Sequence, residues 1–214
     1  VNDDHVKVIT KDGSIKVDRV VLACNGYLGN FEKSLTSKIL PMNNYIVATE
    51  SLDDQTVKKI NPRDIAFADS RFVINYFRLS ADKRLLFGGG ENYSQELSSN
   101  IIPIVTKPLE KIYPFLKGVK IDYAWGGKLA ITMNRLPFFT TLYQDKVISA
   151  QGYSGQGVAL ASYSGKLVSE KIAGNGETFD IMAKIPRQSF PGGRFLRNPS
   201  MKLGMLYYSL MDRL

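Results

Sequence analysis

The alternation of apolar and polar residues predicts two kinds of strand. Residues 6–10 alternate between apolar and polar side chains, and residues 11–14 have the composition of a hairpin turn. Residues 20–23 are instead a continuous apolar run, which is typical of a strand buried on both faces of a parallel sheet. Residues 146–150 form a second run of this kind. The start of the chain and the block near residue 150 therefore have the pattern of parallel-sheet material.

The middle of the chain has the pattern of an antiparallel sheet with one helix. Strands are predicted over residues 45–50 and on both sides of a turn at 81–83, within the segment 72–90. Residues 101–117 are expected to be mostly helical after Pro108, with one apolar face. The predicted fold therefore mixes α/β and α+β classes, as a parallel layer interrupted by an antiparallel insertion.

A glycine-rich stretch links the last predicted strand to the last long helix. Gly152, Gly155 and Gly157 accompany a helix expected to run from Ser154 to Ile172. Free N–H groups at such a helix start attract negative charge, and glycines let a flat ligand approach the backbone. The spacing does not match a phosphate loop or the first turn of a Rossmann fold. On spacing alone, a ligand site and a plain tight turn are equally open.

Composition and charge limit the classes of function. The chain has 214 residues, of which 44% are hydrophobic and 22% charged, enough for one large or two small folded domains. Its net charge is +8, but the Lys and Arg residues are scattered, so an ordinary cationic surface is favoured over nucleic-acid binding. A single Cys and a single His exclude an internal disulfide and any metal site built on several of either. No apolar run is long enough for a membrane span, and the single Cys fits a cytoplasmic location.

Five residues could line a ligand site or could serve the fold alone. Asn25 and Gly26 follow a predicted buried strand, where they could approach a nucleotide or form a simple turn. Tyr76 and Arg78 alternate along a strand and so share a face, either of a pocket or of a solvated surface. Trp125, the single tryptophan, could stack on a ligand ring or pack in the core.

Five stretches together resemble the carboxyl-terminal half of the D-amino-acid-oxidase-type FAD oxidoreductases. In chain order they are VDRVVLACNGYLG, YFRLSADKRLLFGGG, VKIDYAWGGKLAITMNRLP, GYSGQGVALASYSGKLVSEKIAG and FPGGR. The resemblance covers nearly the whole chain from about residue 5, and it is greatest to the members that oxidise gamma-glutamylputrescine. It implies a Rossmann-like FAD-binding domain interleaved with an antiparallel-sheet substrate domain.

The resemblance also implies the limits of these domains. Residues 1–30 would end the FAD-binding domain, and residues 31–125 would form the substrate domain. Residues 126–174 would return to the FAD-binding domain, and residues 175–214 would be a carboxyl-terminal tail. This order agrees with a parallel layer interrupted by an antiparallel insertion.

Roles for individual residues follow from the resemblance. In this family the glycine stretch places a helix start near the N1 and C2-carbonyl end of the flavin ring, where N–H groups stabilise negative charge. The residues expected to contact FAD are Asn25, Gly26, Gly152, Tyr153, Ser154, Gly155, Gln156, Gly157 and Val158. The residues expected to form the catalytic pocket are Tyr76, Arg78 and Trp125, with Arg78 on a substrate carboxylate.

Departures from the family pattern shape the expected chemistry. The segment WGGKLAIT lacks the cysteine that attaches flavin in sarcosine-oxidase-like members, so the FAD is expected to be noncovalent. Ala159 stands where those members hold the substrate carboxylate with a lysine, so an amine is expected rather than a simple amino acid. Gln156 and Asn134 replace a common His and a common Asp. The strand at 85–87 lacks a lysine that helps oxygen react, which leaves the electron acceptor open.

These features predict the carboxyl-terminal part of an FAD-dependent amine oxidoreductase. The intact enzyme would pass hydride from the carbon next to the amine of a gamma-glutamylputrescine-like substrate to flavin N5, giving an imine and then an aldehyde. The G-x-G-x-x-G stretch that holds the FAD pyrophosphate in this family does not occur in the 214 residues. We therefore expect that a missing amino-terminal segment completes the site. The alternative is a truncated, inactive chain that serves only as a structural or interaction module.

Overall fold

The computed structural model describes residues 1, 5–71, 74–90 and 96–193, together with residues 196, 199, 200, 202–204 and 207. Two compact units are present, each made of two segments of chain. Unit 1 consists of Val1–Pro41 and Leu129–Arg197, and unit 2 of Met42–Lys128 and Asn198–Leu214. The expected FAD and substrate domains had limits near residues 30 and 125, and their assignment to the two units stays a prediction.

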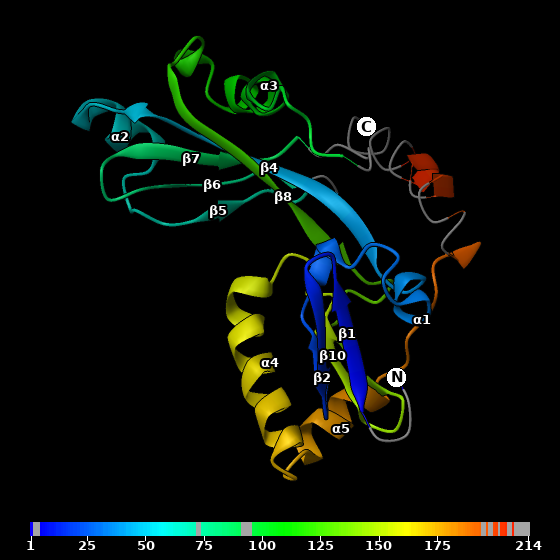
Figure 1. The fold of residues 1–214 in the computed structure, drawn as a ribbon. Helices are drawn as coiled ribbons and strands as arrows, with labels where there is room; N and C mark the ends of the chain where they lie inside the picture. The colour runs from blue at the N-terminus through cyan, green and yellow to red at the C-terminus, as the bar shows by residue number, and fades with distance from the viewer. Residues whose placement is uncertain are drawn as a thin grey trace. The chain divides into compact units, whose positions relative to one another are not determined.

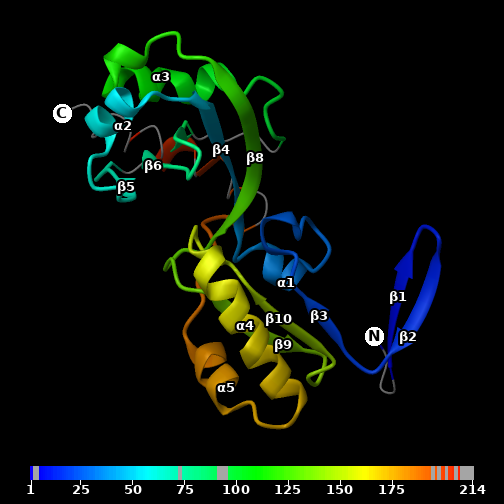
Figure 2. The same cartoon turned by 90° about the vertical axis from the view of Figure 1, so that its left-hand side faces the viewer.

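Unit 1 contains a hairpin, a mixed sheet and the helices that cover it. Its elements are β1 (Val6–Thr10), β2 (Gly13–Val17), β3 (Val20–Leu22), the 3-10 helix η1 (Asn25–Tyr27), α1 (Lys33–Thr36), β9 (Phe138–Leu142), β10 (Val147–Gln151), α4 (Gly157–Ile172) and α5 (Glu177–Lys184). The hairpin of β1 and β2 is antiparallel, as predicted. The sheet has the order β3-β10-β9, with β3 parallel and β9 antiparallel to β10. Helix α4 packs on β10, and α5 packs on β9 and α4 (Figures 1 and 2).

Burial confirms one of the two predicted parallel strands and corrects the other. Every residue of β10 is buried, and Ile148 packs with Leu167 of α4 and Phe179 of α5. Val21 of β3 is 42% exposed, so the prediction of burial on both faces is wrong for this strand. The reason is that β3 ends the sheet and pairs with β10 alone among the described residues.

Helix α4 begins later than the apolar pattern predicted. The expected start was Ser154, but the helix begins at Gly157. Ser154 and Gly155 have φ angles of 52° and 97°, which are left-handed values outside any right-handed helix. The glycine stretch is therefore a separate loop that precedes the helix.

Unit 2 is built on a five-stranded sheet. Its elements are α2 (Asp54–Ile60), β5 (Phe67–Ala68), β6 (Tyr76–Leu79), β7 (Arg84–Gly88), α3 (Ile102–Ile112), the 3-10 helix η2 (Pro114–Leu116) and most of β4 (Leu40–Ser51) and β8 (Ile121–Ile131). The first two residues of β4 and the last three of β8 belong to unit 1. The strand order is β5-β6-β7-β4-β8, and the pairs β5–β6, β6–β7 and β4–β7 are antiparallel. The predicted strands on both sides of the turn at 81–83 are confirmed as β6 and β7, while residues 72 and 73 lie outside the described residues.

Helix α3 shows where packing overrides a local rule. The expected helix followed Pro108, but α3 begins at Ile102 and contains this proline. A proline inside a helix removes one backbone hydrogen bond. Val105 and Leu109 of α3 are fully buried in the same core as Leu85 and Phe87, so burial of apolar surface offsets that loss.

A charged network ties β7 to β8 across β4. The Nη1 group of Arg84 donates to the Asp122 carboxylate at 2.6 Å and to the Thr49 carbonyl oxygen at 2.8 Å. Lys120 Nζ lies 2.9 Å from the same carboxylate. Hydrogen bonds from Arg84 and Lys120 hold the pKa of Asp122 below its usual value. The carboxylate is therefore charged at neutral pH, and Arg84 joins β7 to both β4 and β8.

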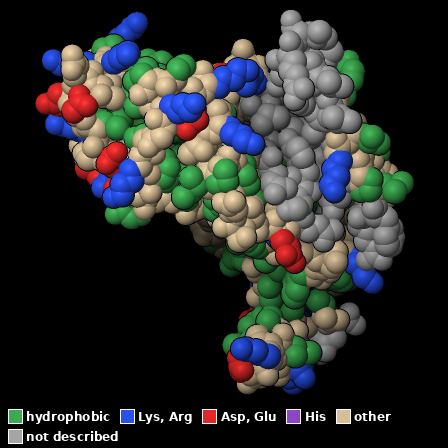
Figure 3. All heavy atoms as spheres, turned by 90° about the horizontal axis from the view of Figure 1, so that it is seen from above, with side chains coloured by type: hydrophobic (Ala, Val, Ile, Leu, Met, Phe, Trp, Pro, Cys, Tyr) green, Lys and Arg blue, Asp and Glu red, His purple; other side chains and the backbone are tan. Residues whose placement is uncertain are grey.

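One face of the described surface shows dispersed charge. On the face drawn in Figure 3, Lys and Arg side chains are spread out, with Asp and Glu among them. None of the described helices is both long and apolar enough to cross a membrane. No group of three or more Cys, His, Asp or Glu suited to a metal ion occurs within the described part of the chain.

Candidate functional site

The glycine loop of unit 1 joins β10 to α4 and has an unusual backbone. Gly152, Ser154 and Gly155 all have positive φ angles, of 76°, 52° and 97°. A Cβ atom on Gly155 would meet no heavy atom within 4 Å, so the loop is open to a ligand at this point. Glycine is favoured at position 155 because it adopts a positive φ angle easily, and not because a side chain there would be crowded.

Hydrogen bonds fix the loop from two sides. The N–H of Gly152 donates to Oδ1 of Asn25 at 3.1 Å, which joins η1 to the loop. The N–H of Ser154 donates to the carbonyl oxygen of Ala130 at 2.9 Å, and Ser154 Oγ accepts from the N–H of Thr132 at 3.2 Å. Asn25 and Gly152 are thus brought together although they are far apart in sequence. Of these partners, Ala130 and Thr132 were not among the expected site residues, because a backbone contact leaves no sequence signal.

The start of α4 is exposed and has no side-chain cap. Gln156 occupies the N-cap position and accepts no hydrogen bond from the first turn through its side chain. Val158, in the first turn, is 100% exposed. The first N–H groups of a helix have no partner within the helix and carry partial positive charge. This helix start can therefore donate hydrogen bonds to an electron-rich group.

Unit 2 brings the three expected pocket residues to one hollow. Tyr76, Arg78 and Trp125 line a cavity of about 240 Å³ on one face of the sheet. The remaining lining residues are Ile46, Ala66, Phe67, Phe77, Leu86 and Gly88. The walls are mainly apolar, and Arg78 supplies the charge, so the hollow suits a mainly apolar molecule that carries an anionic group.

Tyr76 is held in place by two neighbours. Its hydroxyl donates to Oδ1 of Asn44 on β4. A Cβ atom on Gly88 would lie 2.1 Å from the Tyr76 ring, so the ring rests directly on this glycine. Asn44 was not predicted from the sequence, because nothing in the pattern showed which residue of β4 would face β6.

Arg78 and Trp125 are less constrained than Tyr76. Arg78 Nε donates to the carbonyl oxygen of Leu79 at 3.2 Å, and the side chain is otherwise exposed. Trp125 is 45% exposed, so the alternative of a tryptophan packed in the core is excluded. Both side chains are therefore available to a ligand.

A comparison with known protein families shows which family the chain belongs to. The model of the DAO family, described as FAD dependent oxidoreductase, matches residues 1–171. The chain belongs to this FAD-dependent oxidoreductase family. The expectation drawn from the five sequence stretches is confirmed, and FAD is the cofactor of the family.

Two bacterial proteins match this chain over almost the whole of its length. The chain is 38% identical over 208 residues to gamma-glutamylputrescine oxidoreductase of Escherichia coli (strain K12), covering 97% of this chain and 49% of that protein. It is 40% identical over 208 residues to the probable oxidoreductase OrdL of Rhizobium meliloti (strain 1021), and the match covers 97% of this chain and 48% of that protein. The chain thus spans about half the length of the relatives it matches.

Solved structures of DAO-type enzymes share the fold. Glycine oxidase from Bacillus cereus ATCC 14579 superposes with a TM-score of 0.66 and 17% identity, over 87% of this chain and 51% of that one. L-proline dehydrogenase from P. horikoshii superposes with a TM-score of 0.61 and 23% sequence identity, over 80% of this chain and 47% of that one. The mixture of helices and sheets, antiparallel ones included, therefore has known counterparts.

The glycine loop offers hydrogen-bond donors and open space to a cofactor. The donors available there are the N–H groups at the start of α4, and the open side of Gly155 leaves room for a flat group. The 214 residues supply no G-x-G-x-x-G stretch for the pyrophosphate. The loop therefore suits one end of the cofactor.

Proposed function

We propose that this chain is the carboxyl-terminal part of an FAD-dependent oxidoreductase that acts on the CH–NH group of a gamma-glutamylputrescine-like amine. The observation that carries the proposal is the exposed, uncapped start of α4, held in place through Asn25 and Gly152. Support for the substrate comes from the 38% identity to a relative named for gamma-glutamylputrescine. In this proposal the enzyme takes part in polyamine breakdown in the cytoplasm.

In unit 1, the proposed role of the chain is to hold the flavin ring and stabilise charge on it. FAD, when bound, supplies the acceptor for the hydride that leaves the substrate. The N–H groups of Gly157 and Val158 stabilise negative charge at the ring, because they are already oriented by the helix. Asn25 positions the loop by accepting the Gly152 N–H. The flavin is held noncovalently, since the WGGKLAIT segment in β8 has no cysteine.

In unit 2, the proposed role of the chain is to bind the amine substrate. Tyr76 and Trp125 contact the aliphatic part, and Arg78 pairs with the carboxylate of the glutamyl end. Unit 1 would then correspond to a Rossmann-like FAD domain interrupted by unit 2 as the substrate domain. No side chain of the pocket is assigned as a general base, because the cofactor carries the chemistry.

Arg78→Ala tests the substrate proposal. In the full-length, flavin-loaded enzyme we expect the KM for a gamma-glutamylated diamine to rise about tenfold or more, because a charge-assisted hydrogen bond is lost. The KM for the plain diamine should change little. Steady-state assays with both substrates measure this difference, and Arg63→Ala, an exposed arginine of unit 2 outside the pocket, is the control. Equal changes for both substrates would remove Arg78 from the proposed role.

A second candidate, an interaction module, is favoured by the open edge of unit 1. Strand β3 ends its sheet, and beside it lies a hollow of about 370 Å³. The hollow is lined by Val21, Ala23, Asn25, Ala150, Tyr153, Gly157, Ala161, Ser164, Gly165 and Val168. Small apolar residues allow close approach of another segment. In our proposal, the part of the relatives' length that this sequence lacks pairs with β3 and fills this hollow.

Flavin retention tests whether the chain needs a complementary segment to hold the cofactor. The chain of 214 residues, mixed with FAD and desalted, is expected to lose its absorbance near about 450 nm, because the pyrophosphate end of the cofactor is unsupported. An FAD-free desalted sample of the same chain provides the baseline. Retained flavin would show that the loop suffices, and would contradict the need for a complementary segment.

A further inference from the structure

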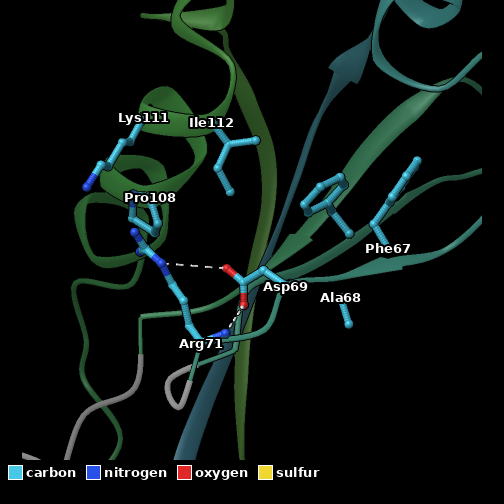
Figure 4. A pocket seen from close by; sticks show the side chains of 8 residues that line it. Phe67, Ala68, Asp69, Arg71, Pro108, Lys111 and Ile112 are labelled. Carbon is cyan, nitrogen blue, oxygen red and sulfur yellow. Dashed lines mark hydrogen bonds and ion pairs between the residues drawn. The ribbon is translucent and has the colours of Figure 1, made fainter. Parts of the chain in front are cut away.

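A second cavity of unit 2 shares Phe67 and Phe77 with the proposed substrate hollow and is otherwise lined by different residues. It has a volume of about 420 Å³ and lies between β5 and α3. Its lining is Phe67, Ala68, Asp69, Arg71, Phe77, Pro108, Lys111 and Ile112. Figure 4 shows Lys111, Pro108 and Arg71 along one side, Phe67 on the other, and Asp69 between them. The volume falls within the range of about 300 to 1,000 Å³ that is usual for small-molecule sites.

This cavity uses the opposite face of the sheet from the substrate hollow. Side chains alternate along a strand, so Phe77 points away from the face that carries Tyr76 and Arg78. Its ring packs against Tyr113, which follows α3, with centroids 5.5 Å apart. Phe67 and Phe77 line both cavities, while Tyr76, Arg78 and Trp125 line the substrate hollow alone.

Aromatic and aliphatic side chains form the walls of the cavity. The rings of Phe67 and Phe77 are stacked, with centroids 5.2 Å apart and planes at 23°. Pro108 and Ile112 of α3 line the other side. Two stacked rings facing a helix present flat apolar surfaces, so the geometry suits a planar apolar group.

The charged side chains at the cavity leave a positive balance. Both oxygens of Asp69 are occupied: Oδ1 accepts from the N–H of Asn75 at 2.9 Å, and Oδ2 accepts from Asn75 Nδ2 at 2.6 Å. Arg71 Nε lies 3.9 Å from Asp69 Oδ2, which is an ion-pair distance beyond hydrogen-bond range. Lys111 has no ion-pair partner within the described ranges of the chain. One carboxylate therefore faces two cations, and donors remain for a bound anion.

We propose that this cavity binds a small planar apolar molecule that carries one carboxylate. The apolar part lies against Phe67, Pro108 and Ile112, and the carboxylate lies at the rim near Lys111 and Arg71. A neutral molecule would gain only the apolar contacts, and a cation would be repelled by the positive balance. The proposed site does not depend on FAD, since none of its residues belongs to unit 1.

Matched probes and a matched variant test this site. We expect 2-naphthoate to bind the chain about three- to tenfold more tightly than its neutral isostere 2-naphthamide in titration calorimetry, because only the former has a charge for Lys111. Lys111→Gln should remove most of this difference and leave 2-naphthamide binding unchanged. Lys107→Gln, an exposed lysine on the same helix that does not line the cavity, should leave both affinities unchanged.

Two further variants place the probe in this cavity. Ile112→Glu, at a partly exposed wall position, should weaken 2-naphthoate binding more than 2-naphthamide binding by repelling the carboxylate. Arg78→Gln, in the substrate hollow, should leave the affinities for 2-naphthoate and 2-naphthamide unchanged. Equal binding of the two probes, equal effects of the two lysine changes, or loss of 2-naphthoate binding on Arg78→Gln would each overturn the proposal. Failure of both probes to bind would do so as well, while the flavin and Arg78 experiments would still stand on their own.

Discussion

In the full-length, flavin-loaded enzyme that we propose contains this chain, replacing Gly155 with alanine is expected to weaken the retention of FAD. Gly155 has a φ of 97°, a value that L residues adopt only at a cost of about 1–2 kcal/mol. The loop can escape this strain by rotating, which would turn the N–H groups at the start of α4 away from the flavin ring. We expect the affinity for FAD to fall about tenfold or more, measured by the absorbance near about 450 nm that survives desalting.

Gly174→Ala is the matched control for this change. Gly174 follows α4 at its other end, has a φ of 91°, and a Cβ there would also meet nothing within 4 Å. Both substitutions should therefore lower the free energy of unfolding by a similar amount, but only Gly155→Ala should release flavin. Equal FAD retention in the two variants would show that the loop conformation is irrelevant to the cofactor.

Removing the ring of Phe87 is expected to lower the free energy of unfolding far more than removing an exposed ring of the same unit. Phe87 on β7 is fully buried, and its ring stacks on Phe77 with centroids 5.4 Å apart and planes at 2°. Phe87→Ala should lower the free energy of unfolding by about 3–5 kcal/mol, because it removes a large buried side chain and leaves a cavity. Urea unfolding followed by circular dichroism measures this loss.

Phe115→Ala provides the comparison within the same unit. Phe115 of η2 is 44% exposed and contacts Tyr113 edge to face at 5.7 Å, with Lys59 Nζ over its ring at 3.8 Å. We expect a loss of about 1 kcal/mol or less. A comparable loss for both phenylalanines would mean that the five-stranded sheet does not depend on its buried aromatic stack.

Local patterns in the sequence predicted most strands, because strand signals are carried by neighbouring residues. The hairpin of β1 and β2, the turn between β6 and β7, and the burial of β10 all follow from apolar spacing and turn residues. Helix α2 was missed although a signal existed. Asp53 caps it by accepting the N–H of Thr56, which matches a common helix-start pattern.

The remaining features depend on contacts between distant residues. No spacing rule could show that Asn25 would accept the Gly152 N–H, or that the Tyr76 ring would lie on Gly88. The exposed position of β3 depends on which strands are its neighbours, and a run of apolar residues cannot report this. Sequence reasoning selected Tyr76, Arg78 and Trp125 as a group, and the structure places them around one hollow. Their roles stay a prediction.

The arrangement of the two units has a consequence for synthesis on the ribosome. The hairpin β6–β7, helix α2 and helix α3 all lie within Met42–Lys128, so they emerge together. Strand β3 emerges before them, but its parallel neighbour β10 emerges only after them. A nascent chain would therefore carry β3 without its partner β10 while unit 2 folds, and closing the sheet of unit 1 would be a late, long-range step. Nascent chains paused between these events are where we would look for bound chaperones.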